Sequence, residues 1–120
     1  LYAATCHFYK IGAAATFIRR NGIVECLIST SLPVGVSYKL DMEKSEKDLY
    51  NGDFLVMVSD GVLEYLHVPN PEETMQEIIE SIETNNATIL AKRILERVLL
   101  FTGGKAADDM TVLATAIWEK

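Results

Sequence analysis

One stretch, residues 52–64, constrains the fold of this chain most. A polar Gly52-Asp53 pair opens it, five apolar residues follow at 54–58, and Ser59-Asp60-Gly61 ends the apolar run. The length of this run, its two valines and its phenylalanine favour a strand covered on both faces, although periodicity alone does not separate such a strand from a short helical segment. A carboxylate at the mouth of a buried strand is costly to desolvate unless it is paired or ligates a metal. We therefore expect Asp60 to have a partner.

A second strand-like run, at residues 110–117, is preceded immediately by Asp108 and Asp109. If the two strands pair antiparallel, the end of the first and the start of the second fall on the same sheet edge. Carboxylates brought together there repel each other, and an oxygen-seeking divalent cation such as magnesium or manganese would relieve the repulsion. The alternative is that Asp60 begins a turn with Gly61 and that the two later aspartates form a solvated strand entrance.

Composition excludes several classes of function. With 120 residues, 49% of them hydrophobic and 23% charged, the chain has the composition of one globular domain or part of one. A net charge of -6, with 11 scattered Lys and Arg residues, argues against nucleic-acid binding. No apolar run approaches the roughly 18 residues that span a bilayer, and the first residues lack the pattern of a signal peptide. We expect a cytoplasmic chain with no nucleic-acid partner and no membrane contact of its own.

The first half of the chain has the pattern of antiparallel strands. Residues 5–11, 16–19 and 23–28 are strand-like, and Asn21-Gly22 is a strong hairpin signal because both residues tolerate the positive φ angles of a type I′ turn. These strands predict a meander in which each pairs with the next. The charged segment 39–49 predicts an exposed edge strand, so the first half is expected to form one nearly continuous sheet.

Two helices are predicted between the central and the last strand. Asn70-Pro71 followed by Glu73 combines a capping residue, proline at the first helical position and glutamate three residues after the cap. Apolar residues recur at helical spacing in both segments, which is typical of helices packed on a sheet. They are Met75, Ile78, Ile79 and Ile82 in the first segment and Leu90, Ala91, Ile94, Leu95, Val98 and Phe101 in the second.

Taken together, these stretches resemble the C-terminal half of the metal-dependent type 2C (PPM-type) protein Ser/Thr phosphatases. The resemblance rests on Gly52-Asp53, Ser59-Asp60-Gly61, the two-helix segment and the run from Asp108 to Val112, in that order. Further stretches look like the phosphatase domain of the stage II sporulation protein E family, so that the likeness extends from about Phe8 to Ile117. These stretches are residues 8–12, 17–20, 32–36 and 52–64.

The resemblance implies an α+β fold, an antiparallel β-sandwich flanked by helices, of which residues 1–120 would be the C-terminal part of a single catalytic domain. It also implies a binuclear manganese or magnesium centre with Asp60 and Asp108 at ligand positions. Asp109 stands where many relatives have Asn, and Gly61 lets the chain turn away from the metal. The implied activity is hydrolysis of phosphoserine and phosphothreonine by direct attack of a metal-bound water. The implied substrate is a regulatory protein, a phosphorylated anti-anti-sigma factor in sporulation.

The chain departs from the family pattern in one respect. Asp60-Gly61 is its only Asp-Gly pair, so no such motif precedes the central strand, where relatives supply the carboxylate that bridges both metals. The chain alone is therefore expected to be inactive, to leave a sheet edge open to self-association, and to derive from a longer protein, cytoplasmic or anchored to a membrane with this domain on the cytoplasmic side. The alternatives are a stress-response regulatory phosphatase of the same family and a non-catalytic protein-interaction module.

Overall fold

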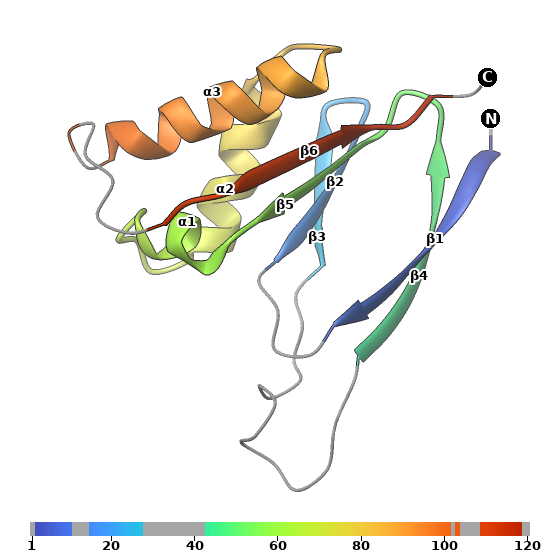
Figure 1. Cartoon of the computed structure of the whole chain (residues 1–120), viewed down its shortest axis with the longest axis horizontal. Helices are drawn as coiled ribbons and strands as arrows, with labels where there is room; N and C mark the ends of the chain where they lie inside the picture. Colours follow the sequence, from blue (N-terminus) through green and yellow to red (C-terminus); the bar gives the residue numbers. More distant parts are fainter. Residues whose placement is uncertain (1, 11–14, 28–42, 102, 104–108, 119–120) are drawn as a thin grey trace, which may run out of the picture.

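A computed structural model describes residues 2–10, 15–27, 43–101, 103 and 109–118 of the chain (Figure 1). In this part of the chain, strands fill most of the first half and helices separate the last two strands. The elements are β1 (Tyr2–Lys10), β2 (Thr16–Arg20), β3 (Ile23–Leu27), β4 (Glu43–Tyr50), β5 (Phe54–Val58), α1 (Asp60–Glu64), α2 (Pro71–Ser81), α3 (Ala87–Leu100) and β6 (Val112–Ala116).

The larger sheet contains β5 near its middle. Its strand order is β3-β2-β5-β6, and every neighbouring pair is antiparallel. The hairpin between β2 and β3 turns at Asn21 and Gly22, whose φ angles of 51° and 77° are both positive, as predicted for this dipeptide. The pairing of β5 with β6 confirms that the apolar run at 54–58 and the last strand lie side by side.

The predicted meander is wrong, because β1 pairs with β4 in a separate two-stranded sheet. Strand β2 already uses one edge for β3 and the other for β5, which leaves no edge for β1. The first half of the chain therefore contributes to two sheets rather than to one continuous sheet. A strand pattern indicates that a segment is extended, whereas the choice of partner depends on residues far along the chain.

Helices α2 and α3 cover one face of the four-stranded sheet, with α3 beside β6 and α2 over β2 and β3 (Figure 1). Most of the predicted apolar stripes is buried, but Ala91 and Leu95 are only partly buried, and Phe101, which follows the end of α3, is 48% exposed. Side chains of both layers meet in one core. The largest fully buried members include Phe17, Val56, Met75, Ile79, Leu90, Ile94 and Val98. No described helix has the length and apolar character needed to cross a bilayer.

The opposite face of the four-stranded sheet is partly covered by the two-stranded sheet. Leu49 of β4 and Ile18 of β2 are buried together, with Leu55 packed against them. Further along β5 and β6 the same face is open, and Met57 and Leu113 are 38% and 55% exposed. The arrangement is an α+β fold in which helices flank an antiparallel sandwich, as predicted.

Candidate functional site

The candidate site lies where β5 ends and β6 begins. The register places Val58 opposite Val112, one step before the two strands separate. At that step the backbone N–H of Ser59 donates to the carbonyl oxygen of Thr111 over 3.0 Å, and the N–H of Thr111 donates to Oγ of Ser59, also over 3.0 Å. The sheet edge predicted from the sequence is therefore formed, and it carries Asp60 on one strand end.

Asp60 is the first residue of α1, because the chain leaves the sheet at Ser59 and turns into a short helix. Buried Val62 and Leu63 anchor this helix to the core. Asp60 itself is exposed. The expectation that its carboxylate needs a partner to offset desolvation is thus wrong for this structure, since water can solvate the group where the helix leaves the covered faces of the sheet.

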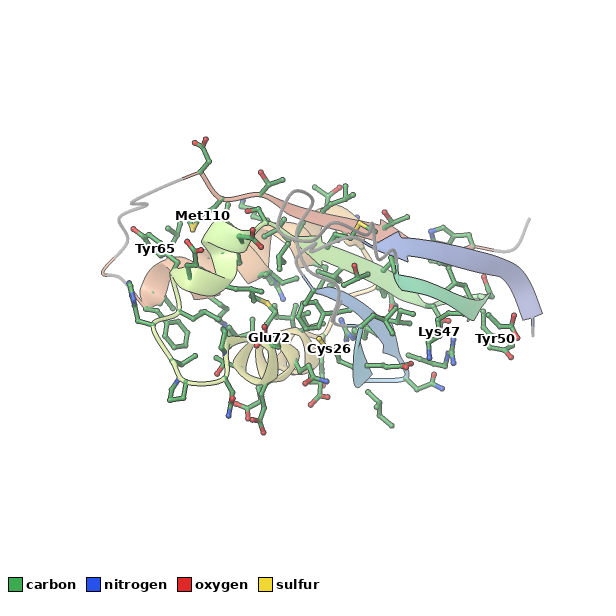
Figure 2. All side chains as sticks on the ribbon, turned by 90° about the horizontal axis from the view of Figure 1, so that it is seen from below. Cys26, Lys47, Tyr50, Tyr65, Glu72 and Met110 are labelled. Atoms are coloured by element: carbon green, nitrogen blue, oxygen red, sulfur yellow. The ribbon has the colours of Figure 1, made fainter. Side chains whose placement is uncertain are left out.

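Gly61 brings the two strand ends into close contact. A Cβ atom at Gly61 would overlap the carbonyl oxygen of Asp109, and Met110 lies next to the same spot, beside α1 (Figure 2). The φ angle of Gly61 is not positive, so this glycine is required for close backbone approach rather than for an unusual turn. Of the predicted site residues, the structure brings Asp60, Gly61 and Asp109 together. Asp108 lies outside the described residues.

The chemistry of this edge suits a hard cation, but the described donors are few. Asp60 is an exposed carboxylate, and the backbone carbonyl oxygen of Asp109, a residue that is also exposed, lies against the neighbouring Gly61. Oxygen donors of this kind are the ligands that magnesium and manganese prefer. Within the described ranges, no three His, Cys, Asp or Glu side chains are grouped so that they could hold a metal ion. The described residues thus provide some, but not all, of the oxygen ligands that a metal site needs.

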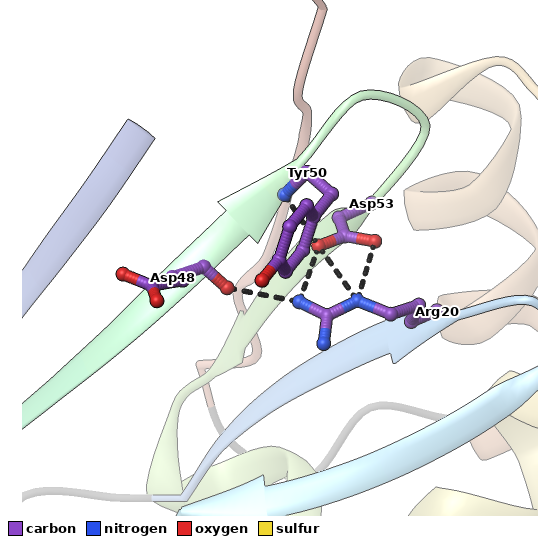
Figure 3. A network of polar contacts seen from close by, with 4 residues as sticks. All are labelled: Arg20, Asp48, Tyr50 and Asp53. Atoms are coloured by element: carbon purple, nitrogen blue, oxygen red, sulfur yellow. Dashed lines mark hydrogen bonds and ion pairs between the residues drawn. The ribbon is translucent and has the colours of Figure 1, made fainter. Parts of the chain in front are cut away.

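A buried carboxylate lies at the other end of β5, where the sequence shows only the polar Gly52-Asp53 pair. Asp53 is 2% exposed and accepts hydrogen bonds from Nε of Arg20 to both of its oxygens, at 3.0 and 3.1 Å (Figure 3). Nη2 of Arg20 donates to Oδ2 over 2.7 Å, and the N–H of Tyr50 donates to the same oxygen over 2.8 Å. The only sequence signal was the acidic residue of Gly52-Asp53 directly before an apolar run.

Arg20 joins this cluster to the second sheet. Its Nη2 also donates to the carbonyl oxygen of Asp48 in β4 over 2.9 Å, and its guanidinium lies 4.5 Å from the centre of the Tyr50 ring. The hydrogen bonds to Asp53 raise the pKa of Arg20 above its ordinary value and outweigh the opposing effect of burial. The guanidinium therefore stays charged, and this end of β5 is tied to β2 and β4 by a satisfied ion pair.

Comparison with known proteins identifies relatives over nearly the whole chain. Residues 1–117 match the family model described as Stage II sporulation protein E. Stage II sporulation protein E of Bacillus subtilis (strain 168) is 34% identical over 118 residues, which are 98% of this chain and 14% of that protein. The protein of the same name from Priestia megaterium is 33% identical over 118 residues, 98% of this chain and 20% of that protein. The chain thus spans a small part of these relatives.

Solved structures show the same fold. The PP2C phosphatase domain of SpoIIE from Bacillus subtilis, solved with a fragment of its regulatory domain, gives a TM-score of 0.89 at 33% identity, over 98% of this chain and 36% of that one. The phosphatase domain of SpoIIE presoaked with Mn gives a TM-score of 0.84 at 30% identity, over 98% of this chain and 52% of that one. The Mycobacterium tuberculosis serine/threonine phosphatase PstP/Ppp gives a TM-score of 0.64 at 18% identity, over 97% of this chain and 56% of that one. This match shows a likeness of fold alone.

Proposed function

Because the chain belongs to the stage II sporulation protein E family, we propose that residues 1–120 are the C-terminal part of a single PP2C-type catalytic domain that hydrolyses phosphoserine and phosphothreonine. The observation that carries the proposal is the junction of β5 and β6, where Asp60 is exposed and Gly61 is packed against the backbone of Asp109. A related phosphatase domain of which this chain covers 52% supports the assignment to one part of a larger domain.

The proposed cofactor is manganese or magnesium, held in part by the carboxylates of Asp60 and Asp108. The Mn-presoaked structure of the related phosphatase domain supports the choice of ion. Such ions neutralise phosphoryl charge and lower the pKa of a bound water. In this chain, Asp60 would hold the ion from the start of α1, and Gly61 would let the backbone of Asp109 approach it. The remaining ligands would come from the rest of the catalytic domain.

The proposed substrate is a phosphorylated regulatory protein, a phosphorylated anti-anti-sigma factor in sporulation. The proposed place of the reaction is the cytoplasm. The family name and the description of its Bacillus subtilis relative as a cell fate determinant support a role in sporulation. A stress-response regulatory phosphatase is the second candidate, since the RsbU and RsbW domains of Rv1364c from Mycobacterium tuberculosis match with a TM-score of 0.74 at 20% identity. Comparing turnover of phosphorylated substrates from the two classes would separate these candidates.

Replacing either proposed ligand tests the function. In the complete catalytic domain, Asp60→Asn and Asp108→Asn should each lower manganese-dependent hydrolysis of an aryl phosphate by orders of magnitude and leave the circular dichroism spectrum unchanged. Each substitution removes a ligand charge at nearly constant size. The control is Glu83→Gln, which removes an exposed carboxylate from the segment between α2 and α3. Near-normal turnover of either Asp variant at saturating manganese would mean that its ligand assignment is wrong. If neither the parent domain nor any variant turned over the substrate at saturating manganese, a non-catalytic interaction module would be favoured.

The 120-residue chain alone should bind manganese weakly and show no measurable phosphatase activity. Two-metal catalysis needs ions about 3.5–4 Å apart, and without a bridging carboxylate this spacing is not enforced. We also propose that the chain self-associates through β6, which among the described strands pairs only with β5. Calorimetric titration with manganese, a phosphopeptide assay and sedimentation velocity check these three points. Turnover with two tightly bound ions, or a monomer at every concentration, would contradict them.

A further inference from the structure

The last step of the β5–β6 ladder uses a side chain in place of a backbone acceptor. In a regular antiparallel pair of strands, every second pair of facing residues exchanges two hydrogen bonds between backbone N–H and carbonyl groups. Ser59 donates its N–H to the carbonyl of Thr111 as expected, but the N–H of Thr111 donates to the hydroxyl oxygen of Ser59. The backbone carbonyl of Ser59 instead accepts from the N–H of Val62 over 3.0 Å, at the start of α1.

This exchange follows from the change of structure at Ser59. The first carbonyl of a helix must point along the helix axis to accept from the next turn, so it no longer points across to the neighbouring strand. The hydroxyl of Ser59 supplies the missing acceptor, and β6 stays paired for one step beyond the end of β5. The chain that holds Asp109 is thereby kept against Gly61.

Helix capping does not explain the serine. A serine at the N-cap usually accepts a hydrogen bond from the backbone N–H of the second or third helical residue. Ser59 occupies the N-cap position of α1 with extended backbone angles, φ −75° and ψ 161°, and makes no such side-chain bond. Its hydroxyl is hydrogen-bonded to the neighbouring strand end at Thr111 rather than to α1.

We infer that Ser59 is a positioning residue for the proposed metal site. Through Thr111 it sets the distance between Asp60 at the start of α1 and the backbone of Asp109 before β6. This inference rests on the proposed function, since it concerns the ligands of the same ion. Residues that orient metal ligands without touching the ion typically affect metal affinity or activity by about 10–100-fold when they are replaced.

A pair of variants of equal shape isolates the hydroxyl. In the complete catalytic domain, Ser59→Thr keeps the hydroxyl, whereas Ser59→Val replaces it by a methyl group. We expect Ser59→Val to weaken manganese binding, measured by calorimetry, by about 10–100-fold, and Ser59→Thr to stay near the parent. Ser81→Ala is the control, because Ser81 on α2 also has a hydrogen-bonded hydroxyl, which donates to the carbonyl of Ile78. It should leave manganese affinity unchanged.

Hydrogen exchange without metal tests the contact itself. We expect the Thr111 amide of Ser59→Val to exchange about tenfold faster than in the parent or in Ser59→Thr, since one lost hydrogen bond is of this order. Unchanged exchange and unchanged affinity in Ser59→Val would overturn the inference. So would a domain that folds with Thr at this position but with neither Val nor Ala, because the role would then be general stability.

The two proposals fail in different ways. If Asp60→Asn leaves manganese binding and turnover intact, the proposed metal site is wrong whatever Ser59 does. If Asp60→Asn abolishes binding while Ser59→Val behaves like Ser59→Thr, the metal site stands and only the role of Ser59 is refuted.

Discussion

The two ends of β5 carry the same residue types in opposite environments. At the first end, Asp53 is buried and its charge is balanced by Arg20 and a backbone N–H. At the second end, Asp60 is exposed, and the strands are joined by backbone contacts and the single hydroxyl of Ser59. A buried carboxylate that is hydrogen-bonded by protein groups would have to lose a partner to bind a cation. An exposed carboxylate can bind a cation without that loss. We therefore propose that the first end stabilises the fold and that the second end binds the metal ion.

The glycines beside these aspartates also differ in what they contribute. Gly52 has a φ angle of 93° and open space where a Cβ would lie, so it serves the turn between β4 and β5. Gly61 has no positive φ angle and is packed against the Asp109 carbonyl. A Gly-Asp and an Asp-Gly pair, only a few residues apart, therefore meet different physical requirements.

Removing Arg20 should give the largest loss of stability at the first end. Arg20→Met leaves Asp53 buried without its cation. We expect the free energy of unfolding of the complete domain, measured by urea denaturation, to fall by about 3 kcal/mol. This value is at the low end for a broken buried ion pair because the Arg20 side chain is 42% exposed. The pKa of Arg20 is raised in the folded protein. Its contribution to stability is therefore fully present below the ordinary arginine pKa and is lost only as the pH rises through the raised value. The arginine thus adds no pH dependence near neutrality.

The matched control for Arg20→Met is an exposed ion pair that also links the two sheets. Nζ of Lys47 in β4 lies 2.7 Å from Oε1 of Glu25 in β3, with side chains 35% and 54% exposed. Glu25→Gln should cost less than about 1 kcal/mol, and less again at high salt. Equal losses for Arg20→Met and Glu25→Gln would mean that burial of Asp53 contributes nothing, and the contrast between the two ends of β5 would fail.

Gly61→Ala should lower stability less than Arg20→Met does, but it should also weaken binding at the proposed metal site. Alanine in a helix normally stabilises relative to glycine, whereas here its Cβ must displace the Asp109 carbonyl, at a cost typical of overpacking, about 1–3 kcal/mol. Urea denaturation and manganese titration of the complete domain check the result. We expect lower manganese affinity in Gly61→Ala and unchanged affinity in Arg20→Met. A stabilised Gly61→Ala with normal affinity would show that the two strand ends separate freely.

Much of the architecture was predictable because it depends on local pattern. The positive φ angles that Asn21 and Gly22 tolerate fix the hairpin, and the helical spacing of residues such as Ile79 and Ile94 fixes which faces of α2 and α3 are buried. The unbroken apolar run at 54–58 predicted a central strand, whereas from the sequence its pairing with the last strand was only a condition, which the structure shows to be met. The ligand roles of Asp60 and Asp108 stay predictions.

Only the tertiary structure decided which strand β1 joins, which aspartate is buried and what the hydroxyl of Ser59 binds. Each depends on groups far apart in sequence: β1 pairs with β4, Asp53 meets Arg20 across 33 residues, and Ser59 meets Thr111 across 52. Sequence periodicity reports which side of a segment is apolar, and turn residues report where the chain reverses. Neither reports which distant backbone or charge will reach a given side chain, because that depends on how the layers pack once they have formed.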